Sequence, residues 1–189
     1  LPIAIGILTE EEVLDWEKIK NYAFIGELAL DGLIRGINGV LPLVLGLKEA
    51  GIVDIVVPKS NAKEAALIDG VNIYPAEHLT DVVNHFIDTK ITPLNIDIQK
   101  YLTAQSEIEY PYDFKDVKGQ QKAKKALEIA AAGGHNMLMI GSPGSGKTLM
   151  AKCFPSILPP LTLPEALELT KIYSICGLLS QEEPLMSKR

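Results

Sequence analysis

The stretch Gly141–Thr148 reads Gly-Ser-Pro-Gly-Ser-Gly-Lys-Thr and constrains the chain more than any other feature. It matches the pattern G-x-x-x-x-G-K-[S/T], which acts only between a buried strand and a helix. An apolar run, Asn136–Ile140, precedes the loop, and a helical pattern from Thr148 to Phe154 follows it. Glycines let such a turn aim successive backbone N–H groups inward, which makes an anion cradle at a helix N-terminus.

The loop therefore predicts a site for ATP and Mg²⁺, and an ordinary glycine-rich turn is the disfavoured alternative. Lys147 is expected to reach the β- and γ-phosphates, and the Thr148 hydroxyl is expected to be the Mg²⁺ ligand. The predicted phosphate-binding residues are Gly141, Ser142, Pro143, Gly144, Ser145, Gly146, Lys147 and Thr148.

Charge is divided unevenly along the 189 residues, whose formal net charge is −6. Residues 1–88 hold 6 basic and 14 acidic side chains, which gives −8, whereas residues 89–189 hold 12 and 10, which gives +2. We therefore do not expect residues 1–88 to bind a nucleic-acid backbone. No apolar run reaches the roughly 18 residues of a membrane helix. The opening "LPIAIGIL" resembles neither a natural start nor a signal peptide, so we expect a piece of a longer, cytoplasmic protein.

Residues 1–88 alternate between helix and strand patterns, which predicts an α/β unit. A first helix at Leu1–Leu8 is expected to bury Ile3 and Ile7. A capping box of Thr9 and Glu12 is expected to start a second helix, which carries Val13, Trp16 and Ile19. Further predictions are a hairpin turning at Asp31-Gly32, helices at 40–50, 62–67 and 79–87, and strands at 52–58 and 71–74.

Residues 89–112 lack periodicity and are predicted to be a linker, and the second half follows them. Helices are expected at 120–132, ended by Gly133-Gly134, and at 165–172, capped by Thr162. The cluster of Lys122, Lys124 and Lys125 is interpreted as a solvated helix face, with a phosphate or nucleic-acid role as the alternative. Cys153 and Cys176 are expected to be reduced and partly buried, and the three histidines are too scattered to predict a metal site.

The sequence from Phe114 to Leu179 resembles the magnesium-chelatase-like AAA+ ATPases, most closely the ComM/YifB-type competence proteins. The segments "GGHNMLMIG" and "ILPPLTLPEALELTKIYS" carry the resemblance beyond the loop itself. The resemblance implies that "DVKGQ" lies beside the adenine, through Val117, Gly119 and Gln120. It also implies a hexameric ring and a parent protein active in DNA branch migration; a metal-chelatase motor subunit is the nearest alternative.

The first half resembles the same family's N-terminal domain, which is itself similar to the proteolytic domain of Lon proteases. The carriers are "GELALDG", "GINGVLPLVLGLKEAGIVDIVVP" and "VNIYPAEHLTDVV". The resemblance implies α/β architecture: a Lon-like (ribosomal-S5-type) domain at 1–88, a linker at 89–112, and the start of a P-loop AAA+ αβα domain at 113–189.

Lon proteases use a serine activated by a lysine. The alignment places that lysine at or near Leu41, and the serine turn falls before Leu1. Lys48 is interpreted as a solvated residue at its helix end. The first domain is therefore expected to lack protease activity; a serine-lysine protease and a protein-interaction module are the alternatives. The family's Walker B carboxylates and arginine finger lie beyond the matched residues, so the chain is expected to bind ATP without hydrolysing it efficiently.

Overall fold

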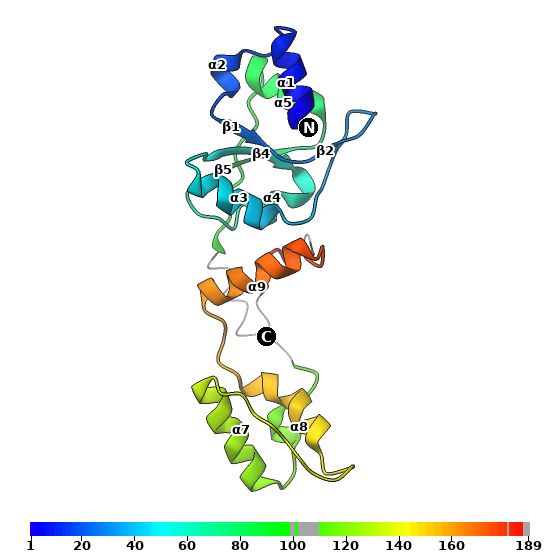
Figure 1. Cartoon of the computed structure of the whole chain (residues 1–189), viewed down its shortest axis with the longest axis vertical. Helices are drawn as coiled ribbons and strands as arrows, with labels where there is room; N and C mark the ends of the chain where they lie inside the picture. Colours follow the sequence, from blue (N-terminus) through cyan, green and yellow to red (C-terminus); the bar gives the residue numbers. More distant parts are fainter. Residues whose placement is uncertain (99–100, 102–109, 181, 187–189) are drawn as a thin grey trace. The chain divides into compact units, whose positions relative to one another are not determined.

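The computed structural model describes residues 1–98, 101, 110–180 and 182–186. The chain divides into two compact units (Figure 1). The first unit comprises Leu1–Gln99 together with Pro164–Met186, and the second comprises Lys100–Leu163 with Ser187–Arg189. Segments distant in the sequence therefore build the first unit.

A parallel sheet of three strands, in the order β1-β4-β5, forms the centre of the first unit. The strands are β1 (Tyr22–Phe24), β4 (Asp54–Pro58) and β5 (Asn72–Ala76). The central strand β4 is buried from Ile55 to Pro58, as expected where helices cover both faces of a parallel strand. Helices α1, α2 and α5 lie on one face of the sheet and α3 and α4 on the other (Figure 1). The predicted α/β class is thereby confirmed.

Local signals account for where these helices begin and end. Their bounds are α1 Pro2–Glu10, α2 Trp16–Ile19, α3 Val40–Glu49, α4 Ala62–Ala65 (after the 3₁₀ turn η1, Lys59–Asn61) and α5 Leu79–Ile87. Gly51 adopts φ 84° after α3, and the Ile52 N–H donates to the Leu47 carbonyl at 2.9 Å. This is a glycine-dependent helix ending, at the end of the predicted helix 40–50. His78 and Asp81 form a capping box that starts α5.

The predicted hairpin is present as an antiparallel pair, β2 (Glu27–Leu28) and β3 (Ile34–Arg35). Its turn contains Gly32 at φ 87°, a conformation that favours glycine. The strand pattern before the hairpin turn is divided at Gly26, so that β1 pairs in the parallel sheet and β2 in the hairpin. The main core between the sheet and its helices includes Ile5, Leu14, Ile19, Ile34, Val56, Ala76, Val82 and Phe86.

The start of the chain differs from the prediction in two ways. On α1, Ile5 is buried, while Ile3 and Ile7, expected to be buried, are 81% and 58% exposed. The predicted capping box is also wrong: Thr9 lies inside α1, and its hydroxyl donates to the Ile5 carbonyl at 2.8 Å. Asp15 caps the second helix instead, accepting from the Glu17 N–H at 3.0 Å. A hydroxyl already used within one helix is not available to start the next.

The last helix, α9 (Leu163–Ile175), is longer than the predicted 165–172 and packs within the first unit. The Gly39 N–H donates to the Ser174 carbonyl at 3.0 Å, and the Ser174 hydroxyl donates to Glu64. The sequence division placed this segment with residues 113–189, and that division stays a prediction.

The second unit is helical in its described residues. It contains η3 (Phe114–Asp116), α7 (Gln121–Gly133), α8 (Lys147–Cys153) and η4 (Phe154–Ile157). Helix α7 lies at the predicted position, and Gly134 ends it at φ 63°. A small core joins these elements through Phe114, Val117, Leu127, Met150 and Cys153.

The segment Asn136–Ile140 is not the buried strand that its apolar sequence predicts. It has no regular structure, and Leu138 and Ile140 are 81% and 88% exposed. No described residue of the second unit belongs to a strand. The backbone N–H and C=O groups of the segment therefore have no neighbouring strand to form hydrogen bonds with. A lone strand cannot satisfy these groups, whatever its propensity.

The predicted linker 89–112 begins on the first unit, because the Leu94 N–H donates to the Ile73 carbonyl at 2.8 Å. Residues 99–100 and 102–109 of that prediction lie outside the described residues. Across the described ranges, no helix is both long and apolar enough to cross a membrane.

Candidate functional site

The loop 141–146 joins the irregular segment before it to α8 through a tight turn. The Ser145 N–H donates to the Ser142 carbonyl at 3.4 Å within this turn. Gly144 and Gly146 adopt φ values of 79° and 87°, which residues with a Cβ rarely adopt. Gly146 is also the N-cap residue of α8. Gly144 and Gly146 are thus positions where the backbone conformation favours glycine.

Lys147 folds its ammonium group back onto the loop that precedes it. Its Nζ donates to the carbonyls of Gly141 and Ser142, both at 2.8 Å, and to the Ser145 hydroxyl at 3.2 Å. These partners carry no formal charge. The half-buried ammonium group of Lys147 is therefore held only by hydrogen bonds to uncharged oxygen atoms. An anion at this position would offer stronger, charge-assisted hydrogen bonds.

Of the other predicted site residues, some are exposed at or near the loop and one is buried in the core. Thr148, the second residue of α8, is exposed. Gln120 is brought to the loop, because its side-chain Nε2 donates to the Ser145 carbonyl at 3.4 Å. Gly119 is exposed at φ 66° beside it. Val117 is only 4% exposed and belongs to the core of the second unit. Its placement beside an adenine stays a prediction.

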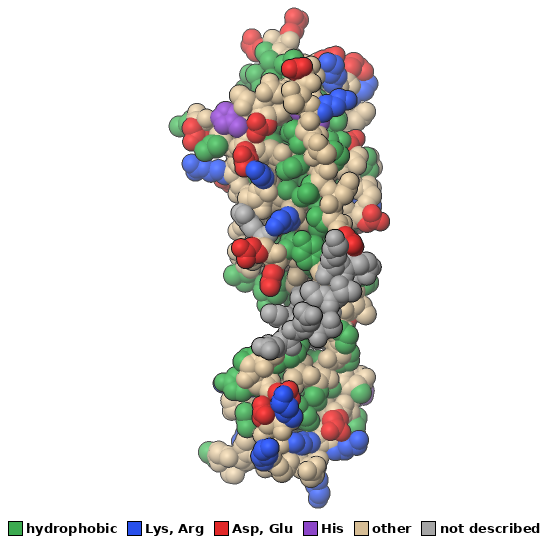
Figure 2. All heavy atoms as spheres, turned by 180° about the vertical axis from the view of Figure 1, so that it is seen from behind, with side chains coloured by type: hydrophobic (Ala, Val, Ile, Leu, Met, Phe, Trp, Pro, Cys, Tyr) green, Lys and Arg blue, Asp and Glu red, His purple; other side chains and the backbone are tan. Residues whose placement is uncertain are grey.

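Lysines are prominent on the surface of the second unit (Figure 2). Lys124 lies over the Phe114 ring at 5.6 Å, and Lys152 lies over the Tyr112 ring at 5.0 Å. Lys125 pairs with Glu128 at 3.5 Å. These contacts are typical of solvated helix faces that cover apolar rings.

Cys153, His78 and His85 occupy structural positions. Cys153 is fully buried, and burial raises the pKa of its thiol; Cys176 is exposed. His78 caps α5, and His85 is buried, with its Nδ1 accepting from the Ile91 N–H at 2.8 Å. Among the described residues, no group of three or more His, Cys, Asp or Glu is arranged to hold a metal ion.

Leu41, at or near which the resemblance is expected to place the Lon catalytic lysine, is a buried leucine. Leu41 is 0% exposed, and its backbone N–H donates to the Glu64 carboxylate at 3.0 Å. Lys48 lies at the exposed end of α3 and donates to the Asp69 carbonyl at 2.7 Å. The ammonium group of Lys48 is therefore hydrogen-bonded at the surface, away from the buried N-terminal turn of α3.

Glu64 is a buried carboxylate that sequence reasoning missed. The carboxylate is 9% exposed at the N-terminus of α3, where the helix dipole favours negative charge. It also accepts from the Asn61 Nδ2 at 3.2 Å and from the Ser174 hydroxyl. No local pattern in "AKEAALI" marks this glutamate as buried, because its two buried partners, Leu41 and Ser174, lie 23 and 110 residues away.

Two family profiles and several known proteins match this chain. The family profile described as "Magnesium chelatase, subunit ChlI" matches residues 113–189, and "Subunit ChlI of Mg-chelatase" matches residues 1–61. Competence protein ComM of Haemophilus influenzae is 41% identical over 175 residues, which is 93% of this chain and 34% of that protein. The YifB protein of Escherichia coli is 40% identical over 175 residues, 93% of this chain and 33% of that protein.

The first half of the chain is also similar to a Lon protease. Lon protease 2 of Bacillus subtilis is 31% identical over 83 residues, 41% of this chain and 15% of that protein. The chain spans about a third of the length of its ComM and YifB relatives. The chain belongs to the magnesium-chelatase-like family of ComM/YifB type, with a Lon-like region in its N-terminal part.

Proposed function

We propose that this chain binds ATP with Mg²⁺ at Gly141–Thr148, as the nucleotide-binding part of an AAA+ motor. The observation that supports this most directly is the position of Lys147. Its ammonium lies against three uncharged oxygens of the loop, within 3.2 Å of each. A cation held in this way exchanges carbonyl partners for phosphate oxygens with a gain in hydrogen-bond strength.

The residues of the loop fit such a ligand. Gly144 and Gly146 have left-handed backbone conformations of the kind that glycine-rich anion-binding loops use, and nothing lies within 4 Å of a Cβ built on either. Thr148 is exposed and would hold Mg²⁺ through its hydroxyl, while Lys147 would neutralise phosphate charge. Bound Mg²⁺ would supply Lewis-acid stabilisation of the phosphate oxygens.

A melting experiment with ATP and Mg²⁺ tests this proposal. At 100 times its dissociation constant, a ligand specific for the folded state adds about 2.7 kcal/mol of stability. Lys147→Ala should remove most of the nucleotide-dependent rise in melting temperature, and Lys125→Ala, an exposed lysine on α7, should keep it. An equal shift in Lys147→Ala and the parent would refute the assignment of the phosphate site.

We further infer that the parent protein is a cytoplasmic, ring-forming ATPase that acts on DNA during competence. Similarity to Competence protein ComM supports this assignment. DNA contacts are assigned outside residues 1–88, since 14 acidic and 6 basic side chains there repel a phosphate backbone. A metal-chelatase motor is the second candidate, because the ChlI profile spans the nucleotide loop. DNA-stimulated against porphyrin-stimulated ATP turnover by the full-length parent separates the two.

The Lon-like region is proposed to lack peptidase activity. Leu41 cannot act as a general base, and its buried N–H is bound to Glu64. Casein and fluorogenic peptides should be cleaved no faster than in buffer. Cleavage that disappears in Lys48→Ala would restore the protease alternative.

A further inference from the structure

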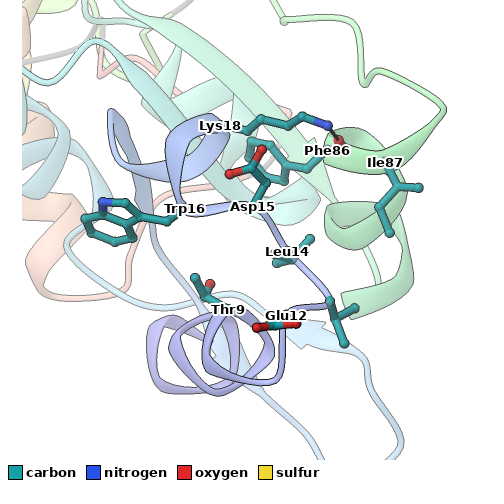
Figure 3. Close-up of a pocket in the computed structure, with 9 residues that line it drawn as sticks. Thr9, Glu12, Leu14, Asp15, Trp16, Lys18, Phe86 and Ile87 are labelled. Carbon is teal, nitrogen blue, oxygen red and sulfur yellow. Dashed lines mark hydrogen bonds between the residues drawn. The ribbon is translucent and has the colours of Figure 1, made fainter.

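An open pocket of about 400 Å³ lies between the turn after α1, helix α2 and the end of α5 (Figure 3). Leu14 and Phe86 line it as parts of the main core, with 2% and 9% of their surfaces exposed. Trp16 and Ile87 lie on opposite sides of the view in Figure 3, with Leu14 between them. The pocket therefore has an apolar floor that is continuous with the core of the first unit.

The walls of this pocket are apolar side chains that the fold leaves in solvent. Trp16, Ile87 and Val13 are 60%, 59% and 45% exposed. Single exposed apolar residues are ordinary on protein surfaces, but here three of them line one hollow with an apolar floor. Exposed tryptophan is also the side chain that contributes most often to the energetic centre of protein interfaces.

The turn after α1, which carries Glu12 and Val13 of the pocket lining, contains a residue in an uncommon backbone conformation. Its hydrogen bonds run from the Glu12 N–H to the Thr9 carbonyl at 3.1 Å and from the Val13 N–H to the Leu8 carbonyl at 2.9 Å. This pattern places Glu12 in the left-handed region, at φ 59°, a position normally taken by glycine or asparagine. The chain thus keeps a carboxylate on the pocket lining where local backbone chemistry favours glycine.

The charge around the pocket is acidic. Residues 9–20 hold five carboxylates and two lysines. Both lysines are engaged: Lys18 donates to the Phe86 carbonyl at 3.3 Å, and Lys20 pairs with Glu17. Glu12 and Asp15 line the pocket itself. Acidic side chains also gather on the end of the first unit that carries α1 and α2 (Figure 2).

We propose that this pocket is a docking site for a basic polypeptide segment of a partner protein. An apolar side chain of the segment enters the pocket over Leu14 and beside Ile87, with Trp16 at the edge, and flanking lysine or arginine side chains lie at Glu12 and Asp15. Charge complementarity selects this occupant, since nucleic acids and anionic membranes are repelled by the same carboxylates. The site is independent of nucleotide binding at Lys147.

Fluorescence gives a direct test, because Trp16 is the only tryptophan of the chain. The probes are short synthetic peptides with a Leu, Phe or Met anchor between lysines. Matched peptides carry serine in place of the anchor, or glutamates in place of the lysines. We expect a saturable blue shift of tryptophan emission with the lysine-flanked apolar peptides, weakening as NaCl is added. The serine and glutamate peptides should give none.

Variants of the 189-residue chain locate the binding. Trp16→Ala, followed by calorimetry, should weaken binding of the best peptide about tenfold or more. Glu12→Gly together with Asp15→Asn should weaken it about fivefold; glycine suits the turn, and asparagine still caps α2. Leu30→Ala and Glu49→Gln, exposed residues away from the pocket lining, should bind as the parent does.

The proposal is overturned if no lysine-flanked peptide gives a saturable shift, or if Trp16→Ala binds as tightly as the parent. A blue shift on raising the protein concentration alone would assign the pocket to a second copy. A shift with phosphatidylglycerol vesicles alone would assign it to a lipid surface.

Discussion

The buried carboxylate of Glu64 offers the sharpest test of how the first unit is held together. Its two oxygens accept from the Leu41 N–H at 3.0 Å, from the Asn61 side chain at 3.2 Å, and from the Ser174 hydroxyl. Two of these donors belong to residues that are almost fully buried: Leu41 is 0% exposed and Ser174 is 2% exposed. Through Ser174, the carboxylate joins α9 to the Lon-like part of the chain.

The expected cost of removing this carboxylate follows from its donors. In Glu64→Ala, the Leu41 N–H and the Ser174 hydroxyl lose their acceptor in places that water does not reach readily. Each buried donor left unpaired costs about 1–3 kcal/mol. The half-buried Asn61 side chain keeps its hydrogen bonds with Ile37. The variant also no longer has to bury a charged carboxylate, and this gain offsets part of the loss. We therefore expect a destabilisation of about 3 kcal/mol.

A double-mutant cycle then isolates the contact with α9. Ser174→Ala removes one hydrogen bond to a charged acceptor and should cost about 1.5 kcal/mol. In the double variant the serine hydroxyl is no longer left unpaired, so the combined loss should be about 1–2 kcal/mol smaller than the sum. Glu49→Ala and Ser60→Ala, both exposed, serve as controls and should stay within about 0.5 kcal/mol of the parent.

Urea unfolding followed by Trp16 fluorescence is the appropriate assay, because the single tryptophan lies in the first unit. With an m-value of about 1.5 kcal/mol per molar urea, Glu64→Ala should lower the midpoint by about 2 M. Additive losses, or a Ser174→Ala variant as stable as the controls, would refute the reasoning. Helix α9 would then not be anchored to the first unit by this contact.

Three further predictions concern other parts of the chain. Burial and the nearby Lys90 lower the pKa of His85, so the folded state binds its proton less readily than the unfolded state. Stability should therefore fall as pH drops from about 7.5 through 6.5 to 5.5, and His85→Gln should lose that component of the pH dependence in parallel thermal melts; identical pH profiles would contradict this. Glu12→Gly should raise the unfolding free energy by about 0.5–1 kcal/mol in urea titrations, because glycine removes the left-handed strain; a loss of stability would show that the Glu12 side chain itself holds the turn. Phosphate release from ATP by the 189-residue chain should stay far below about 1 per second, because Glu168 lies on α9, not at a strand end facing the loop; Lys147-dependent turnover at that rate would show that the chain supplies its own catalytic carboxylate.

Much of the fold was predictable wherever the signal is local. Gly51 after α3, Asp31-Gly32 in the hairpin and Gly134 after α7 each mark a position where the backbone has positive φ or turns sharply. These signals work without knowledge of the rest of the chain, because the conformational preference belongs to the residue itself. The glycine-rich loop is of the same kind, since Gly144 and Gly146 both have left-handed φ angles.

Predictions failed where a residue's environment depends on distant partners. Ile7 matches a buried helical position by spacing, yet the sheet meets α1 at Ile5. Ile140 belongs to a run typical of a buried strand, but no described part of the second unit supplies a strand beside it. Periodicity identifies which residues share a face; it does not identify what covers that face.

The sequence by itself determined the α/β class, the family, the hairpin, most helix ends and the tight turn of the glycine-rich loop, because each rests on short-range stereochemistry or on motifs that can be read along the chain. The tertiary structure alone decided that Glu64 is buried, that α9 lies with the first unit, and that Trp16 stands open beside an apolar pocket. Burial and hydrogen bonding of these side chains depend on groups up to 110 residues away. The free energy of such contacts is set by packing in three dimensions, and no local pattern of residues encodes it.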